Sequence, residues 1–321
     1  MKFKIDNFVL AIIAVVIIAY FFPEPGSTQS KIPLDTISTI GVSLIFFFYG
    51  LKLSPEKIRS GLKNWKLHVL IQASTYLLFP VIVIIGYPFF KESHFSIWLA
   101  FLFLAALPST VSSSVVMVSI AKGNIPAAIF NASISGLIGI AVTPLWVGLF
   151  LEQAAADFDL GHIYLKLLTE ILLPVVLGLA LQRWGHAYTV RYNKYLTLFD
   201  KTIVLLIVYK SFAGSFEKKV FSSVNVFDLL LIALAVVLLF YGVYGIIGFI
   251  AQRLGFSRED SITARFCGTK KSLVHGTVFS KVLFPASMPA GLILLPLMLF
   301  HAIQIFIVSI IASNLAKEKE I

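Results

Sequence analysis

The stretch Phe266-Cys267-Gly268-Thr269-Lys270-Lys271-Ser272-Leu273-Val274-His275-Gly276 places two adjacent lysines between apolar segments. A charged side chain at the middle of a bilayer costs roughly 2.5–3.5 kcal/mol on insertion scales, so such a residue is expected to face protein or water and to serve a function. Gly268 and Gly276 weaken the helix on either side, while Thr269 and Ser272 can satisfy backbone groups that a break leaves free. The stretch therefore predicts a helix that is broken within the membrane and forms half of a transport site.

The composition around this stretch is that of a membrane protein. Of the 321 residues, 58% are hydrophobic and 13% are charged, and the mean hydropathy is +0.92. This is too apolar for a soluble chain, so the sequence predicts an all-α polytopic protein. Ten apolar segments are predicted to cross the membrane: 8–22, 37–53, 67–87, 97–121, 127–151, 165–182, 202–216, 227–252, 260–283 and 289–312.

The positions of the basic residues indicate the orientation of the chain. The net charge of +10 could suggest nucleic acid, but the lysines and arginines concentrate in alternate connections, such as 52–66 and 183–201. Cytoplasmic loops carry an excess of Lys and Arg. We therefore predict a multi-pass protein of the bacterial inner membrane with both termini in the cytoplasm, and no nucleic-acid partner.

A second break is predicted in the fourth apolar segment. Pro108-Ser109-Thr110-Val111-Ser112-Ser113-Ser114 puts one proline and five hydroxyl side chains into seven residues. Proline cannot donate a backbone hydrogen bond, and the hydroxyls can either patch the break or face a polar cavity. Two interpretations therefore stay open: the segment is a kinked helix patched by its own hydroxyls, or it forms half of a binding site.

The two breaks divide the chain into similar halves. Each break falls in the fourth segment of a group of five, and an odd number of crossings gives the halves opposite orientations. We predict one transmembrane unit over 1–321, built from inverted five-helix repeats at 1–155 and 156–321. Broken helices 4 and 9 are expected to cross at mid-membrane.

Further polar residues lie at membrane depth outside the breaks. Gln72 lies in the third segment. Asn131 and Ser135 are four residues apart on one helical face, which we expect to face the serine cluster. His301 and Gln304 are one turn apart in the last segment. An interhelical hydrogen bond is the alternative role for a lone residue such as Gln72.

Two local signals concern structure more than chemistry. Ser257-Arg258-Glu259-Asp260 has the pattern of a capping box and predicts the start of the helix before the second break. Lys210 lies near the end of the seventh segment, where we expect it to extend to the outer surface; a role in the site is the alternative.

Enzyme chemistry has little support in the sequence. The chain lacks the H-E-x-x-H and G-x-S-x-G motifs, and one cysteine, Cys267, excludes an intramolecular disulfide and a cysteine-cluster metal site. We predict that the protein is not an enzyme and needs no cofactor. No carboxylate lies between Glu92 and Glu152 or between Asp260 and Glu318, so any ion coupling in these segments uses hydroxyls, amides, carbonyls or basic groups.

The breaks, the hydroxyl cluster and the motif over 266–272 resemble those of the sodium/bile-acid symporter superfamily, in particular its SBF-like bacterial branch of sodium-dependent transporters. The resemblance covers nearly the whole chain. It implies a ten-helix fold with a core from 66–151 and 226–315 and a panel from 7–54 and 163–217. The substrate is then expected between core and panel, beside the crossing.

The resemblance also implies sodium ligands, with one departure. The motif of the sodium-coupled members matches the following residues here: Gln72, Ser112, Ser113, Ser114, Asn131 and Ser135. Where those members carry a glutamate and a glutamine in helix 9, this chain has Phe266 or Cys267 and then Lys270-Lys271. A lysine 4 Å from Na⁺ would repel it by about 4 kcal/mol at an effective dielectric constant near 20.

Adjacent residues on a helix point about 100° apart, so a regular helix would present one lysine to the crossing, and an unwound segment could present both. Lys271 aligns with Ser113 in the internal repeat and is the first choice for the buried charge, with Lys270 second. Such a lysine could hold an anionic group of the substrate or replace a bound cation.

These observations predict a secondary active transporter of a small organic anion that works by alternating access, with Na⁺ as candidate coupling ion. Two alternatives stay open: a transporter that is proton-coupled or uncoupled through Lys270 and Lys271, and a non-transporting membrane regulator with the same fold. The predicted substrate- and ion-binding residues are Gln72, Pro108, Ser109, Thr110, Ser112, Ser113, Ser114, Asn131, Ser135, Gly268, Thr269, Lys270, Lys271, Ser272, His301 and Gln304.

Overall fold

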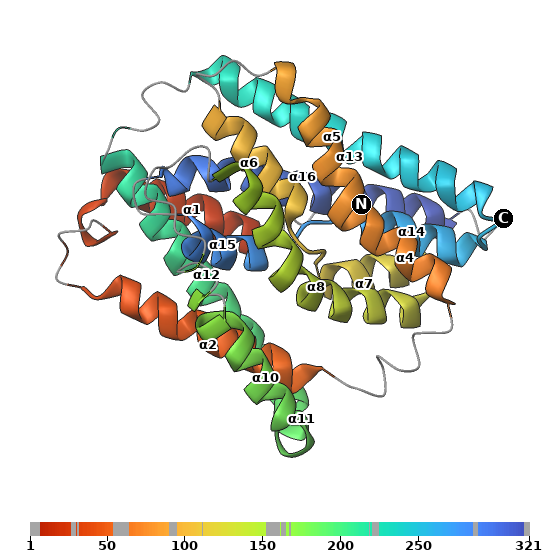
Figure 1. Ribbon diagram of the computed structural model, residues 1–321, viewed down its shortest axis with the longest axis horizontal. Coiled ribbons are helices and arrows are strands. Elements are labelled where there is room, and N and C mark those ends of the chain that lie inside the picture. Colours follow the sequence, from red (N-terminus) through yellow and green to blue (C-terminus); the bar gives the residue numbers. More distant parts are fainter. Residues whose placement is uncertain are drawn as a thin grey trace. The chain divides into compact units, whose positions relative to one another are not determined.

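The computed structural model describes residues 7–26, 30, 32–53, 64–89, 95–110, 112–151, 161, 165–166, 168–217, 219, 225–284 and 288–317, and these contain helices and no strand (Figure 1). The longer elements are α1 (Asn7–Phe21), α2 (Leu34–Lys52), α4 (Trp65–Ala73), η3 (Ser74–Leu78), α5 (Phe79–Ile85), α6 (Phe95–Ala106), α7 (Ser112–Ile120), α8 (Ile125–Leu151), η6 (Leu168–Leu172), α10 (Leu173–Ala180), α11 (Gln182–Arg191), α12 (Asn193–Glu217), α13 (Val226–Arg253), α14 (Arg258–Thr269), α15 (Leu273–Leu283) and α16 (Ala290–Lys317). The short 3₁₀ turns η1 (Glu24–Gly26) and η4 (Tyr87–Phe89) complete the set.

Helices of membrane-spanning length confirm a polytopic membrane protein. In the described chain, five are long and apolar enough to cross a bilayer: α2, the continuous α4–η3–α5, α8, α13 and α16. A sixth is η6–α10 taken together with α11, although the two parts bend by 96°. Helices overlap all ten predicted segments, but ten crossings and the inverted repeat stay predictions.

Both predicted breaks are present. The helix of the fourth segment ends at Ala106 and resumes at Ser112, and the helix of the ninth ends at Thr269 and resumes at Leu273. Lys270 has extended backbone (φ −82°, ψ 145°). Pro108 accounts for the first break, because it has no N–H to continue α6.

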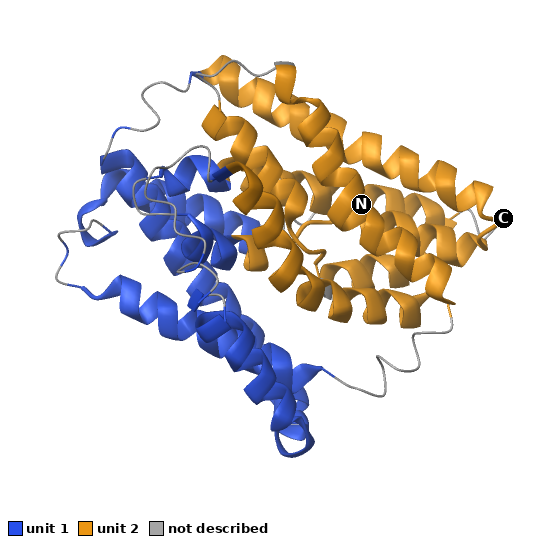
Figure 2. Cartoon of the chain, viewed as in Figure 1, with its two compact units in different colours: residues 1–54, 151–225, 277–294 blue, residues 55–150, 226–276, 295–321 orange. Residues whose placement is uncertain are grey.

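The chain forms two compact units (Figure 2). Unit 1 comprises 1–54, 151–225 and 277–294, and unit 2 comprises 55–150, 226–276 and 295–321. The chain passes from one unit to the other at five points, three of which lie inside helices, namely α8, α15 and α16. Every predicted site residue belongs to unit 2, whereas the predicted core and panel stay predictions.

Within unit 1, α2 and α10 pack closely through two glycines. A Cβ added at Gly50 would clash with the carbonyl oxygen of Val175, and one added at Gly178 would clash with the carbonyl oxygen of Phe47. Small residues permit this close approach of two backbones, which is a common way to pack helices in membranes.

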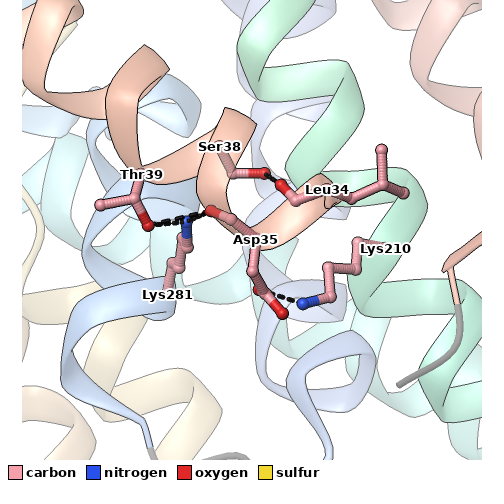
Figure 3. A network of polar contacts seen from close by, with 6 residues as sticks. All are labelled: Leu34, Asp35, Ser38, Thr39, Lys210 and Lys281. Atoms are coloured by element: carbon pink, nitrogen blue, oxygen red, sulfur yellow. Dashed lines mark hydrogen bonds and ion pairs between the residues drawn. The ribbon is translucent and has the colours of Figure 1, made fainter. Parts of the chain in front are cut away.

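Unit 1 also contains a polar network around Asp35 (Figure 3). Lys210 forms an ion pair with the Asp35 carboxylate, whose side chain is 72% exposed. Lys281 of α15 donates to the backbone oxygen of Asp35 (2.8 Å) and to Thr39 Oγ1 (2.6 Å) on α2. Lys210 thus reaches an exposed carboxylate, in agreement with the prediction that it extends to the surface.

In unit 2, a π-helical turn interrupts the hydrogen-bond pattern of the third segment. The N–H of Phe79 donates to the Ser74 carbonyl, five residues earlier. The next N–H in this register would come from position 80, which is a proline. The Thr75 carbonyl therefore has no donor from its own helix and is available to another element.

The helix before the second break begins as the capping pattern predicts. Ser257 is its N-cap, and Ser257 Oγ accepts a hydrogen bond from the Asp260 N–H (3.1 Å). The Asp260 carboxylate accepts from Asn64 Nδ2 and Asn124 Nδ2, both at 2.8 Å. These bonds fix the start of α14 beside α4 and α7, which Figure 1 shows as its neighbours.

Candidate functional site

The two breaks are hydrogen-bonded to each other. The Ser272 N–H donates to the Pro108 carbonyl (2.9 Å), and Ser109 Oγ donates to the Cys267 carbonyl (2.7 Å). All of these groups are buried. Backbone groups that each break removes from its own helix are thus satisfied by the other break, as buried backbone at membrane depth requires.

A side chain from α16 holds the extended backbone of the second break. Gln304 Oε1 accepts from the Lys271 N–H (2.9 Å), and Gln304 Nε2 donates to the Lys271 carbonyl (2.8 Å). His301 Nδ1 lies 3.1 Å from Gln304 Nε2. The predicted pair His301 and Gln304 therefore lies beside the second break and supports the position of Lys271.

The Lys271 ammonium lies among three backbone carbonyls. Nζ donates to the carbonyl oxygens of Thr75 (2.7 Å), Ala105 (2.6 Å) and Leu107 (2.9 Å). It also lies 4.2 Å from the centroid of the Phe79 ring, in cation–π geometry. The side chain is fully buried, and these three bonds use all of its donors.

The carbonyls that bind Lys271 lack donors in their own helices. Ala105 and Leu107 lie at the end of α6, where the last carbonyls of a helix have no internal partner and Pro108 follows. The Ala106 carbonyl between them accepts from Thr143 Oγ1 (2.8 Å) instead. Because the C-terminal end of a helix carries partial negative charge, it favours a cation.

Lys270 has a different environment. Its ammonium donates to the Ser113 carbonyl (2.7 Å) and lies 3.5 Å from Ser113 Oγ, in the first turn of α7. Ser113 Oγ donates to Thr110 Oγ1 (2.9 Å), which lies 2.7 Å from Ser114 Oγ. Lys270 is also fully buried, so the unwound segment places both lysines inside the protein.

Asn131 bonds to α4 and not to the serine cluster, which corrects our expectation of its orientation. Asn131 Nδ2 lies 2.7 Å from His68 Nδ1 and donates to the Ala127 carbonyl (2.9 Å), while its Oδ1 accepts from Gln72 Nε2 (3.0 Å). Gln72 Oε1 is buried and has no hydrogen-bond partner among the described residues. Asn131 and Gln72 therefore share one site, which also includes His68.

Ser135 lies one turn further along α8 and does contact the first break. Ser135 Oγ accepts from the Ser109 N–H (3.0 Å) and lies 3.2 Å from the hydroxyl of Tyr76, which also donates to the Ser135 carbonyl. The two predicted ligands of α8 thus form hydrogen bonds with different partners, Asn131 with α4 and Ser135 with the first break. The expectation was right for Ser135 and wrong for Asn131.

Two more hydroxyls in the second break bond locally. Thr269 Oγ1 donates to the Arg265 carbonyl (2.6 Å), which patches the last turn of α14. Ser272 Oγ lies 2.9 Å from His275 Nδ1. Both hydroxyls are buried, and their bonds stabilise the helix ends on the two sides of the lysines.

The glycines of the motif permit close packing around the break. A Cβ at Gly268 would lie 2.8 Å from Ile247 Cδ1, and one at Gly276 would clash with Leu297 and lie 2.5 Å from Leu107 Cδ1. Larger residues at these positions would require the side chains of Ile247, Leu297 and Leu107 to shift.

The predicted sodium ligands do not form one cluster in the described residues. Ser113 and Ser114 lie with Thr110 beside Lys270, whereas Gln72 and Asn131 lie together between α4 and α8. Ser112 begins α7, but its side chain lies outside the described residues, as does Val111. Where the chain is described, no three His, Cys, Asp or Glu side chains group as metal ligands.

The sequence reasoning missed several residues of the site. Thr75 and Phe79 bind Lys271, and His68 binds Asn131. His68 precedes Gln72 by four residues, so their common helical face was a signal that could have been used. The Thr75 carbonyl had a weaker signal, namely a proline five residues later.

Comparisons with known proteins show the family to which the chain belongs. The model of the SBF-like CPA transporter family matches residues 6–317. The chain is 37% identical to "Uncharacterized protein PA2026" of Pseudomonas aeruginosa, over 99% of this chain and 95% of the relative. It is 35% identical to "Putative symporter YfeH" of Escherichia coli (98% and 94%) and 29% identical to "Sodium/bile acid cotransporter 7-B" of Xenopus laevis (98% and 92%).

Proposed function

The chain belongs to the SBF-like CPA transporter family, and from this premise we propose that it is a secondary active transporter that moves a small organic anion by alternating access. The names of two relatives, a symporter and a sodium/bile acid cotransporter, support transport as the activity. The charge of the substrate is argued from the site of this chain.

The environment of Lys270 is the observation that carries the proposal. An ammonium has three N–H donors, and the described acceptors of Lys270 both belong to Ser113. A buried cation whose donors are not all used among the described residues suits a carboxylate or sulfonate oxygen, which forms charge-assisted hydrogen bonds. The N-terminal end of α7, with its partial positive charge, favours an anion at the same place.

The coupling ion is the second part of the proposal. Gln72 Oε1 and Asn131 Oδ1 are oxygens of the type that binds Na⁺, and Gln72 Oε1 has no hydrogen-bond partner among the described residues. We therefore assign the candidate Na⁺ site to Gln72 and Asn131, which lie with His68 between α4 and α8, away from the lysines. Coupling to protons through Lys270 or Lys271, or no coupling, is the alternative.

Replacing Asn131 with Leu tests the ion site. Leu cannot accept from Gln72 or bond to His68, so we expect Na⁺-dependent uptake to fall at least about tenfold, the effect of about 1.4 kcal/mol. Uptake into proteoliposomes with and without a Na⁺ gradient measures this, with membrane insertion and folding checked in parallel. Unchanged uptake and ion dependence would leave Asn131 with a packing role.

The transport proposal is tested on purified protein. Pooled anionic metabolites would first be screened for thermal stabilisation of the protein with and without Na⁺, and each stabilising compound would then be offered to proteoliposomes as a labelled solute. We expect uptake or exchange that depends on the protein. If compounds stabilise the protein but the proteoliposomes show neither uptake nor exchange of any of them, a membrane regulator with the same fold is the better interpretation.

The cellular location follows from the charge distribution and is also a proposal. We place the protein in the bacterial inner membrane with both termini in the cytoplasm, since the basic residues of the alternate connections suit that side. An organic anion outside or inside the cell then reaches the site from one side at a time.

A further inference from the structure

The three carbonyls that surround the Lys271 ammonium have the arrangement of a site for a monovalent cation. We propose that these three carbonyls form a cation site that Lys271 permanently occupies, so that the protein supplies its own cation there and takes none from solution. The carbonyls of Thr75, Ala105 and Leu107 are called the carbonyl cradle below.

The geometry is that of a site for a positive charge, and not only of a space that a side chain fills. All three oxygens lie 2.6–2.9 Å from the same nitrogen, and they come from two different elements, the π turn of η3 and the end of α6. Rings of backbone carbonyls replace the hydration shell of cations in channels. The face of the Phe79 ring adds a further favourable contact for positive charge.

No carboxylate is needed to balance the lysine. Neither 93–151, which includes α6 to α8, nor 261–317, which includes most of α14 and all of α15 and α16, contains Asp or Glu. In the described residues the Lys271 ammonium has carbonyl oxygens as acceptors, together with the negative end of the α6 dipole. Removal of the lysine would leave these oxygens around an empty space that favours another cation.

The consequence for transport rests on the proposed function. A cation fixed by a covalent chain cannot leave with the substrate, so the carbonyl cradle would not contribute to ion coupling in the wild type. Any coupling Na⁺ would bind elsewhere, for example at Gln72 and Asn131. The binding test below does not require transport, so its failure and the failure of the proposed function can be told apart.

The test is rescue of Lys271→Ala by a free amine. This change removes Cγ, Cδ, Cε and Nζ, which are the same non-hydrogen atoms as those of n-propylammonium. We expect n-propylammonium chloride to raise the Tm of purified Lys271→Ala by about 2 °C or more in a saturable manner, as a ligand specific for the folded state does. Tetramethylammonium chloride, which carries the same charge but no N–H donor, should not raise it.

Two matched proteins serve as controls. Wild type should show no saturable shift, because Lys271 fills the site. Lys281→Ala should show none either, because Lys281 bonds to Asp35 and Thr39 at a part-exposed position (Figure 3), where water replaces the lost donor. A similar shift in either control would mean that the amine acts on the protein generally, and it would overturn the proposal.

A second variant decides the question if Lys271→Ala does not fold. Gln at position 271 retains two N–H donors for three carbonyls, so Lys271→Gln should fold more readily and leave room for a small cation. Ammonium chloride should then raise its Tm and leave that of the wild type unchanged. The absence of a saturable shift in Lys271→Gln, and in Lys271→Ala where it folds, would show that the cradle does not bind free cations.

Discussion

Replacing Lys270 with Gln is expected to lower the initial rate of anion uptake by roughly 30- to 4,000-fold. The substrate anion would lose its charged partner in a buried site. Removing one partner of a buried, hydrogen-bonded charge pair costs about 2–5 kcal/mol, and each 1.4 kcal/mol is a factor of ten. Uptake of the identified anion into proteoliposomes measures the loss.

The controls for Lys270 separate binding from damage to the fold. Lys270→Arg keeps the positive charge and should retain part of the uptake, while Lys281→Gln, in the network of unit 1, changes a lysine outside the proposed site. Thermal unfolding of each variant shows whether the fold survives. Substrate affinity and uptake that stay at the wild-type level in a folded Lys270→Gln would remove Lys270 from the substrate site.

Replacing Lys271 with Met should destabilise the protein more than any other lysine change considered above. Met fills a similar volume but has no donor, so the carbonyls of Thr75, Ala105 and Leu107 lose their partner together. Each buried acceptor left unsatisfied costs about 1–3 kcal/mol. We therefore expect a loss of several kcal/mol, seen as a large drop in Tm in detergent or as failure to isolate folded protein.

The comparison for Lys271 is a lysine with fewer and more exposed bonds. Lys281→Met also removes bonds to a backbone carbonyl and a hydroxyl, but Asp35 and Thr39 are accessible to solvent, so its Tm should change little. A Tm for Lys271→Met as high as that of Lys281→Met would mean that the carbonyls find other donors. The carbonyl cradle would then have no special need for a cation.

These two predictions depend on a distinction that the sequence did not provide. From the residue order, Lys271 was the first choice for a buried charge, and it could either hold an anionic group of the substrate or replace a bound cation. In the structure both lysines are buried, yet Lys271 has three acceptors and Lys270 has only Ser113 among the described residues. We therefore propose Lys270, and not Lys271, for the substrate site.

Features that depend on short segments could be predicted from the residues alone. Long apolar runs predict helices in a bilayer, Pro108 and the glycines beside Lys270 and Lys271 predict the two breaks, and Ser257 predicts the start of α14. These effects act through backbone hydrogen bonds and solvation within a few residues. They are therefore readable without knowledge of what lies nearby in space.

Which groups meet could not be predicted from the residue order, because it depends on how distant segments pack. The hydrogen-bond acceptors of the Lys271 ammonium lie 164–196 residues away in the chain, and they are backbone carbonyls, which every residue has and which no motif distinguishes. Asn131 is hydrogen-bonded to His68 and Gln72, whereas Ser135, on the same face of α8, is hydrogen-bonded to Ser109. Helical spacing shows which residues lie on the same face of a helix, but the packing of neighbouring helices decides which groups those residues bond to.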